Sequence, residues 1–263
     1  MKQIHLNKYL IAAILLLAVA AVFVASALTT NLGEFVTAAF VISGMICAIT
    51  GIFILTFSGG EPVDPQLVGL LPAQGYMNLC RIASDLGITG NAYFLPPRVT
   101  GEARVMQFNP TLPYTGDTVS AKGSFPKTGP AGLVTLPTCT PLIQDLRKRN
   151  GLVIPDNEEQ LTKLLRETIT GIFEFAPRVS ARWHASTVTI TVHRYRFIAG
   201  CQLIVRESPG CCTRNPCAPC SLCGALIAEG TGKVVALEQC SISSSSRDLN
   251  LVFRILPVLD THP

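Results

Sequence analysis

Two long apolar segments near the N-terminus constrain the fold of this chain most strongly. From residue 9 to residue 60 the sequence contains one charged side chain, Glu34. It separates the apolar segments Tyr9–Leu28 and Phe35–Phe57, each about as long as the roughly 20-residue helix that crosses the hydrocarbon core of a bilayer. The link between them is so short that two helices joined by it must be antiparallel neighbours. We therefore predict an N-terminal transmembrane α-helical hairpin in residues 1–60.

The first apolar segment also has features of a cleaved signal peptide. Lys2 and Lys8 give it a basic start, and Ala25-Ser26-Ala27 resembles a cleavage site. The apolar run is longer than the core of a signal peptide, and a second run follows at once, which favours a retained span. Because both lysines precede this span and the link after it has neither lysine nor arginine, the positive-inside rule places both termini in the cytoplasm. A domain on the outer side of the cell membrane is the alternative.

The second apolar segment carries small residues on one helical face. Gly44, Ala48 and Gly51 recur at spacings of three and four, which allow helix backbones to approach closely. We expect this face to pack against the first span, and a homodimer formed through the second span is the alternative. The lipid bilayer is the first partner that the sequence predicts.

The remaining residues, 61–263, are expected to form one soluble domain. Strands and helices do not alternate regularly in them, so we predict an α+β domain with a mainly antiparallel sheet. The segment 109–130, rich in Pro, Gly, Thr and Lys, is expected to be a long hairpin excursion or a mobile flap. The patterns predict helices over 74–86, 141–149 and 219–229 and from Asp156, strands over 91–95, 104–108, 133–136, 173–185, 187–195, 233–242 and 249–256, and a strand or short helix over 196–205.

The charge distribution argues against one class of partner. The formal net charge is +4 and no dense run of lysine and arginine occurs, so we expect no binding of nucleic acid. Arg178, Arg182, Arg194 and Arg196 place positive charge on one predicted hairpin. We expect a solvated face there, and contact with lipid headgroups or an anionic ligand is the alternative.

Five of the ten cysteines fall within residues 211–223, in the pattern CC-x4-C-x2-C-x2-C. In a chain long enough to bury a core, such clustering favours metal ligation or redox chemistry over scattered disulfides. Zinc needs four ligands in a tetrahedron, and thiolates separated by two residues can converge on one ion. The predicted metal ligands are Cys212, Cys217, Cys220 and Cys223, with Cys240 as a substitute.

The same cysteines allow other interpretations. An iron–sulfur cluster also needs four thiolates, but the ferredoxin run continues x3-Cys-Pro, whereas Gly224-Ala225-Leu226 follows Cys223 here. The fourth ligand of a cluster would therefore come from elsewhere. Alternatively, Cys220 and Cys223 are buried small residues of an apolar helix, or two of the cysteines form a redox-active pair. The cofactor stays open between zinc, an iron–sulfur cluster and none.

Familiar catalytic motifs fail in this sequence. Gly230-Thr231-Gly232-Lys233 resembles the end of a P-loop, but Ile227 replaces a required glycine and Val234 replaces the magnesium-binding Ser or Thr. His184 and His193 lie on predicted strands, where we expect a structural role. We assign no catalytic and no cofactor-binding residue, and the sequence favours a protein that is not an enzyme.

Two resemblances add to these patterns. The two-span hairpin, the Pro-Pro segment near Phe94–Arg98 and the segment Pro219–Lys233 resemble a group of uncharacterised archaeal membrane proteins, which implies membrane location and no known activity. Residues Pro219–Leu256 are similar to the closing segment of 4-vinyl-reductase-type small-molecule-binding domains: a helix, a Thr-Gly-Lys turn, a strand ending in Cys240 and a last strand. That similarity implies a sensor of a small apolar ligand.

These observations lead to two hypotheses. The first is a membrane-anchored protein of unknown activity whose cytoplasmic domain binds a ligand, a partner or a metal. The alternative is a redox protein that uses the Cys211–Cys223 cluster for electron transfer or thiol chemistry. Brown colour in anaerobically purified protein would favour an iron–sulfur form of the alternative.

Overall fold

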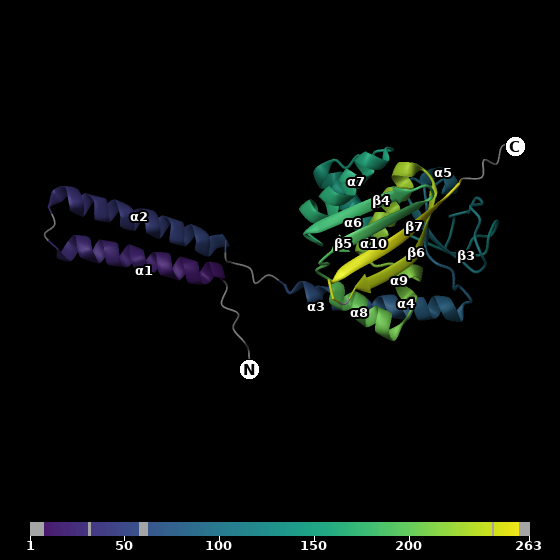
Figure 1. The fold of residues 1–263 in the computed structure, drawn as a ribbon, viewed down its shortest axis with the longest axis horizontal. Coiled ribbons are helices and arrows are strands. Elements are labelled where there is room, and N and C mark those ends of the chain that lie inside the picture. Colours follow the sequence, from purple (N-terminus) through teal and green to yellow (C-terminus); the bar gives the residue numbers. More distant parts are fainter. Residues whose placement is uncertain (1–7, 31–32, 58–62, 244, 258–263) are drawn as a thin grey trace. The chain divides into compact units, whose positions relative to one another are not determined.

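The chain forms two compact units, Met1–Val63 and Asp64–Pro263. Figure 1 shows a helical hairpin in the first unit and a sheet covered by helices in the second. The computed structural model describes residues 8–30, 33–57, 63–243 and 245–257.

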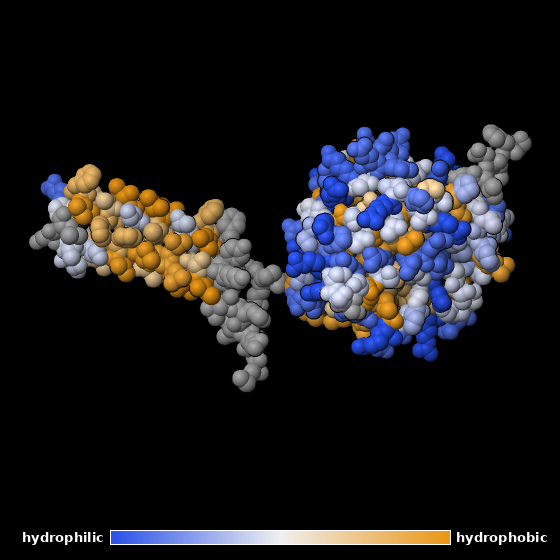
Figure 2. Space-filling view, viewed as in Figure 1, coloured by the Kyte–Doolittle hydropathy of each residue, from blue (hydrophilic) through white to orange (hydrophobic). Residues whose placement is uncertain are grey.

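The first unit is an antiparallel pair of long helices, α1 (Lys8–Thr29) and α2 (Glu34–Phe57). Both are long and apolar enough to cross a membrane, with mean hydropathies of 2.9 and 2.4 over the candidate spans. Large apolar side chains point outward along both helices; Leu15 and Ile46 are each 60% exposed. Figure 2 shows the resulting apolar surface. Contiguous apolar surface of this kind is typical of a membrane or protein contact, which agrees with the predicted hairpin.

Two glycines of α2 lie against α1. A Cβ added at Gly44 would lie 3.1 Å from Val24 Cγ2, and one added at Gly51 would lie 3.1 Å from Leu17 Cγ. The small-residue face of α2 therefore packs against α1, which is the first of the two arrangements expected from the sequence. The homodimer through α2 stays a prediction.

The second unit is built on a seven-stranded sheet with the order β3-β2-β1-β6-β7-β5-β4, in which all neighbours are antiparallel. The predicted fold class, an apolar helical hairpin followed by an α+β region with a mainly antiparallel sheet, is confirmed. In β5, Val188, Ile190 and Val192 alternate toward the core, as the period of two requires. The strands are β1 (Tyr93–Leu95), β2 (Met106–Pro110), β3 (Gly132–Thr135), β4 (Arg178–His184), β5 (Thr187–His193), β6 (Val234–Ser243) and β7 (Asp248–Leu256).

Helices cover the sheet and gather at one of its ends. Figure 1 shows α6, α7 and α10 behind the sheet, and α4, α8 and α9 together below it. The helices are α3 (Pro65–Leu70), α4 (Ala73–Asp85), α5 (Pro97–Thr100), α6 (Thr140–Asn150), α7 (Glu158–Arg166), the π-helix η1 (Glu167–Ile172), α8 (Ile198–Glu207), α9 (Cys211–Arg214) and α10 (Ala218–Thr231).

Two details were not resolved by the sequence patterns. The segment 196–205, expected as a strand or a helix, belongs to α8, because Ile198, Cys201 and Ile204 share one buried face at helical spacing. The α7 helix is capped by Asn157, one residue after Asp156. The Asn157 side chain accepts hydrogen bonds from the first backbone N–H groups of the helix, at 2.8 and 3.4 Å.

Helix α10 runs through the main core. It contacts β1, β6 and β7, and its residues Cys220–Ala228 are all buried. Gly224 permits this close packing, since a Cβ there would lie 2.2 Å from Phe94 Cε2. The N-terminal turn of α10, which carries two of the clustered cysteines, is therefore held in a fixed place.

The segment between β2 and β3, expected as a hairpin excursion or a flap, packs on the opposite face of the sheet. The Tyr114 ring lies edge-on to Tyr93 and Phe108, with centroids 5.1 and 5.2 Å away. Val119 joins the same buried cluster. This segment thus covers the face of β1 and β2 that α10 does not.

Candidate functional site

Two thiols lie at the beginning of α10. Cys217 is the N-cap residue, Pro219 occupies the first turn and Cys220 follows within that turn. The Sγ atoms of Cys217 and Cys220 are 3.4 Å apart. Proline is favoured at the start of a helix because its missing N–H would have no partner there. The sequence Cys-Ala-Pro-Cys therefore brings two sulfurs together at a helix N-terminus, a position that stabilises a thiolate.

Three more thiols extend this pair into a continuous chain, which we call the thiol cluster. The side chains interact in the order Cys212, Cys240, Cys220, Cys217, Cys201. They come from α9, β6, α10 and α8, so only the folded structure assembles them. Because all ten cysteines are free thiols in the structure, the cluster is described in its reduced form.

The direction of the pKa shift alternates along the thiol cluster. The Cys201 thiol, followed by that of Cys220, lowers the pKa of Cys217 well below its usual range. The Cys212 thiol, again followed by Cys220, lowers the pKa of Cys240 to about 5. The pKa values of Cys201, Cys212 and Cys220 are raised, mainly by their interactions with these two thiolates. Each thiol with a lowered pKa therefore has neighbours whose pKa is raised, which avoids like charges on adjacent sulfurs.

Cys223, the fourth predicted metal ligand, does not join the thiol cluster. It lies deep in the core, where burial and the neighbouring Cys139 raise the pKa of its thiol. Cys240, the substitute named from the sequence, lies beside Cys212 and Cys220 instead. Within the described residues, no group of three or more His, Cys, Asp or Glu side chains is arranged to hold a metal ion. The zinc or iron–sulfur site stays a prediction.

An apolar pocket of about 230 Å³ lies beside the thiol cluster, and we call it the thiol pocket. Cys217 and Cys201 are among its lining residues, together with Tyr195 and the rings of Phe175 and Phe197. The Phe197 ring is 5.6 Å from Phe175 and 5.7 Å from Tyr195, centroid to centroid. Cys217 is partly exposed and lines this pocket, so a small molecule bound there would lie beside this residue.

Tyr195 joins the thiol pocket to the thiol cluster. It is among the largest fully buried side chains, and its hydroxyl interacts with Cys217. Burial, reinforced by the Cys217 charge, raises the pKa of Tyr195 well above its usual value. The phenol therefore stays protonated beside the Cys217 sulfur, which it can serve as a hydrogen-bond donor.

Two glycines form the wall of the thiol pocket where α3 meets α8. A Cβ added at Gly200 would lie 2.1 Å from the carbonyl oxygen of Gly69, and one added at Gly69 would lie 2.9 Å from that of Phe197. Only residues without a Cβ allow the two backbones to meet this closely. This contact brings Gly69 and Pro72 to the pocket beside Cys201.

A second thiol pair lies outside the thiol cluster. Cys80 on α4 interacts with Cys211, which together with Arg214 lowers the pKa of Cys80 to about 7. Arg214 also donates to Ser84 Oγ at 3.1 Å, and its carbonyl accepts from Asn109 Nδ2 at 2.7 Å. These contacts fix the backbone that precedes Cys217.

Sequence patterns missed two members of the site. Cys201 and Tyr195 lie outside the cysteine-rich segment, and nothing in their neighbourhood marks them as functional. The helical spacing of Ile198, Cys201 and Ile204 indicated only a buried face. A folded structure was needed to place them against Cys217.

The two units together define a class: an apolar helical hairpin joined to an antiparallel α+β domain with a thiol cluster. The chain belongs to the family described as Domain of unknown function (DUF7982), whose model matches residues 1–199. That match includes both apolar helices and ends before the cysteine-rich segment. Neither the curated proteins nor the solved structures contain a match to this chain. The archaeal origin and the similarity to 4-vinyl-reductase-type domains stay predictions.

Proposed function

We propose that this is a membrane-anchored thiol–disulfide exchange protein that uses Cys217 and Cys220. One observation carries the proposal: the two sulfurs lie 3.4 Å apart at the start of a buried helix, beside an apolar pocket. A sulfur–sulfur bond is about 2.0 Å long, so a small movement converts this pair to a disulfide. A partly exposed, low-pKa cysteine followed at x2 by a resolving cysteine is the usual arrangement for exchange chemistry.

The exchange reaction balances with a disulfide substrate. The Cys217 thiolate attacks one substrate sulfur, the substrate disulfide breaks, and the released thiolate takes a proton from water. Cys220 then attacks the Cys217 sulfur and gives its proton to the second departing thiolate. Two electrons pass from the protein to the substrate, which leaves as two thiols while the protein holds a Cys217–Cys220 disulfide.

The proposed location of this chemistry is the cytoplasmic side of the cell membrane, to which the domain is anchored. The two candidate spans support anchoring in the cell membrane, and Lys2 and Lys8, which precede the first span, support a cytoplasmic domain. Cytoplasmic thiols are kept reduced, and disulfides there are mostly transient and catalytic. The aromatic lining of the thiol pocket favours a substrate with an apolar body next to its sulfur.

Metal binding by the thiol cluster is a second candidate. Cys212, Cys240, Cys220 and Cys217 match zinc or an iron–sulfur cluster in number of ligands, but no three of them are already arranged around one point in the described residues, so binding would require the thiols to move. Metal would occupy the sulfurs that exchange requires. Zinc and iron analysis of anaerobically purified full chain therefore separates the two candidates.

The reaction of the reduced full chain with a small aromatic disulfide tests the exchange proposal. We expect a rapid phase that releases two aromatic thiolates per chain and leaves no mixed disulfide, because Cys220 resolves the intermediate. In the Cys220→Ser variant, one thiolate is released and a stable mixed disulfide remains on Cys217. The Cys217→Ser variant loses the rapid phase.

Cys223→Ser provides the matched control. The sequence contains a second Cys-x2-Cys pair, Cys220 and Cys223, but the structure directs Cys223 into the core. This variant should therefore react like the unmodified chain. A rapid phase that depends on Cys223 and is unaffected by Cys217→Ser would exclude the proposed pair.

A further inference from the structure

Three arginines line an open pocket at the start of the second unit, which we call the arginine pocket. It has a volume of about 460 Å³ and is lined by Arg194, Arg196 and Arg247, with residues 64–66 on its rim. Arg194 and Arg196 follow β5 in sequence. Arg247 comes from the turn between β6 and β7, so the fold brings it to the other two.

Two of the three arginines of this pocket have an uncommon backbone conformation. Arg194 and Arg247 have φ values of +53° and +57°, in the left-handed region that glycine or asparagine occupies most easily. The two turns are joined, since the Tyr195 N–H donates to the Arg247 carbonyl at 2.9 Å. Strained positions that carry large charged residues often mark binding sites.

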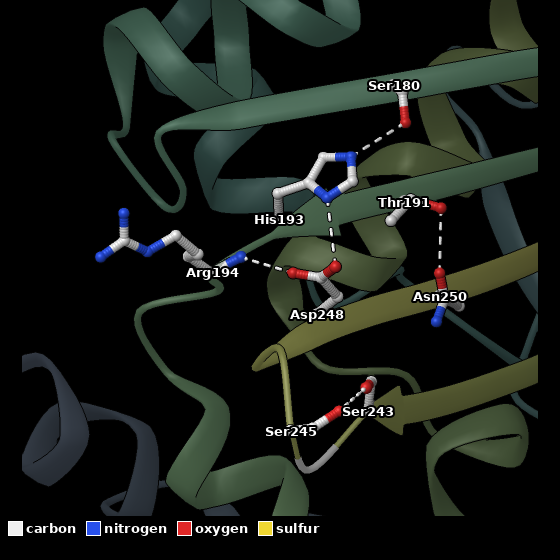
Figure 3. Close-up of polar contacts among 8 residues, drawn as sticks. All are labelled: Ser180, Thr191, His193, Arg194, Ser243, Ser245, Asp248 and Asn250. Carbon is white, nitrogen blue, oxygen red and sulfur yellow. Dashed lines mark hydrogen bonds and ion pairs between the residues drawn. The ribbon is translucent and has the colours of Figure 1, made fainter.

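The acidic groups near the arginine pocket do not neutralise the Arg194 and Arg247 guanidinium groups. Asp248 accepts the Arg194 backbone N–H at 2.9 Å and pairs with His193 Nδ1 at 3.2 Å, so its two oxygens are engaged. Figure 3 shows this arrangement, with the Arg194 side chain extending away from the carboxylate. The Arg194 and Arg247 guanidinium groups have no ion-pair partner within the part of the chain that the structure describes.

Two other acidic groups bear on the charge of the arginine pocket: Glu174, which pairs with one of its arginines, and Asp64, which lines it. Glu174 pairs with Arg196, with Oε2 and Nη1 3.2 Å apart. The Asp64 carboxylate accepts the backbone N–H of Gln66 at 2.9 Å as the N-cap of α3. An anion entering the pocket would therefore meet two unpaired guanidinium groups, a third that can exchange its partner, and one carboxylate, that of Asp64.

The chain length limits how far this pocket can lie from a membrane surface. Asp64 follows Phe57, the last residue of α2, by seven residues. A chain of that length spans at most roughly 25 Å when fully extended. If α2 ends at the bilayer surface, this length sets an upper limit on how far the rim of the arginine pocket can lie from the headgroups.

We infer that Arg194, Arg196 and Arg247 bind the phosphate of an anionic phospholipid headgroup. Guanidinium groups match phosphate oxygens in charge and geometry. The inference rests on the membrane anchoring in the proposed function and is independent of the thiol chemistry. It explains why arginine occupies two positions where the backbone favours glycine.

Native mass spectrometry of the full chain in neutral detergent tests this site with short-chain phosphatidylglycerol and phosphatidylcholine. Phosphatidylglycerol should bind more tightly. Arg194→Gln and Arg247→Gln should each weaken its binding about fivefold, which corresponds to roughly 1 kcal/mol per basic residue near an anionic surface. The double variant should lose about 25-fold. Changing both arginines to lysine should restore only part of the preference, because lysine keeps the charge but lacks the planar geometry of the guanidinium group.

Arg178→Gln with Arg182→Gln is the matched control. The two arginines are exposed on β4 and do not line the arginine pocket. Replacing them removes the same amount of charge as the test pair does. Equal losses in the control and the test pair would overturn the site, as would an unchanged lipid preference in the test pair. Binding of inorganic phosphate as tight as that of the lipid would overturn the headgroup assignment.

Two separate measurements keep this test distinct from the proposed function. Disulfide exchange by the arginine variants should equal that of the unmodified chain. The reason is that no residue lines both the arginine pocket and the thiol pocket, which contains Cys217. Retention of the full chain in membranes after alkaline carbonate extraction tests the anchoring itself. If lipid binding failed while disulfide exchange and membrane retention were normal, the lipid site alone would be refuted.

Discussion

Replacing Gly200 with alanine tests the geometry of the thiol pocket most sharply. The added Cβ would lie 2.1 Å from the Gly69 carbonyl oxygen and 2.7 Å from its carbon. Contacts between carbon and a carbonyl oxygen normally begin near about 3.3 Å, so α3 and α8 must separate by roughly 1 Å. Both neighbours are backbone atoms, so a change of side-chain rotamer cannot relieve the clash.

The expected loss of stability depends on how firmly α3 is packed. Overpacking of this kind costs about 1–3 kcal/mol. Helix α3 buries none of its own residues completely, so it can move away before the sheet is disturbed. We expect a loss of about 2 kcal/mol in the free energy of unfolding, which lowers Tm by roughly 4–8 °C in a domain of this size.

Two readouts follow the Gly200→Ala substitution. Fluorescence of Trp183, the one tryptophan of the chain, reports unfolding, because its indole donates to Thr162 Oγ1 at 2.8 Å between β4 and α7. Alkylation of Cys217 should become faster, since the displaced α3 opens the thiol pocket. Gly75→Ala on α4 is the control: its Cβ meets no atom within 4 Å, so stability should stay equal or rise by about 0.5–1 kcal/mol. Unchanged Tm and unchanged alkylation in Gly200→Ala would refute the α3–α8 contact.

Two further predictions concern titrating groups. Because neighbouring thiols lower the pKa of Cys217, its alkylation rate should be nearly flat between about pH 7 and 9, whereas in urea it should rise about tenfold per pH unit up to about pH 8.5. A tenfold rise per unit in the folded chain would show that Cys217 is an ordinary thiol. The Arg194 backbone N–H, and then His193, lower the pKa of Asp248 in the folded state. Its carboxylate therefore contributes stability above its unfolded pKa, and this contribution disappears as pH falls through the lower folded value. Asp248→Asn should cost about 1 kcal/mol at pH 7 and progressively less below about pH 4; a deficit independent of pH would contradict this assignment.

Much of the fold could be predicted because its signals are local. Segment length and hydropathy predicted α1 and α2, and the alternation in residues 187–193 predicted β5. The helix α4, with Gly87 in the left-handed conformation after it, also follows from adjacent residues. The choice between strand and helix for α8 could not be made locally, because its short apolar run suits both.

The candidate site was only half predictable. Cys-x2-Cys spacing at a helix start identified Cys217 and Cys220 as neighbours. Cys201 and Cys240 reach them from α8 and β6, and the crossing that brings α8 there depends on Gly69 and Gly200. Such contacts between distant segments leave no periodic trace in a single sequence.

The most direct test of the central claim is the redox equilibrium of Cys217 and Cys220. The full chain, purified anaerobically, is equilibrated at a series of thiol–disulfide ratios, quenched with an alkylating agent and mapped by mass spectrometry. Our account predicts a Cys217–Cys220 disulfide that forms in a single two-electron transition, with a tenfold change in ratio for about every 30 mV. Two thiols that stay reduced at every ratio, or sulfurs protected by stoichiometric zinc or iron, would contradict it.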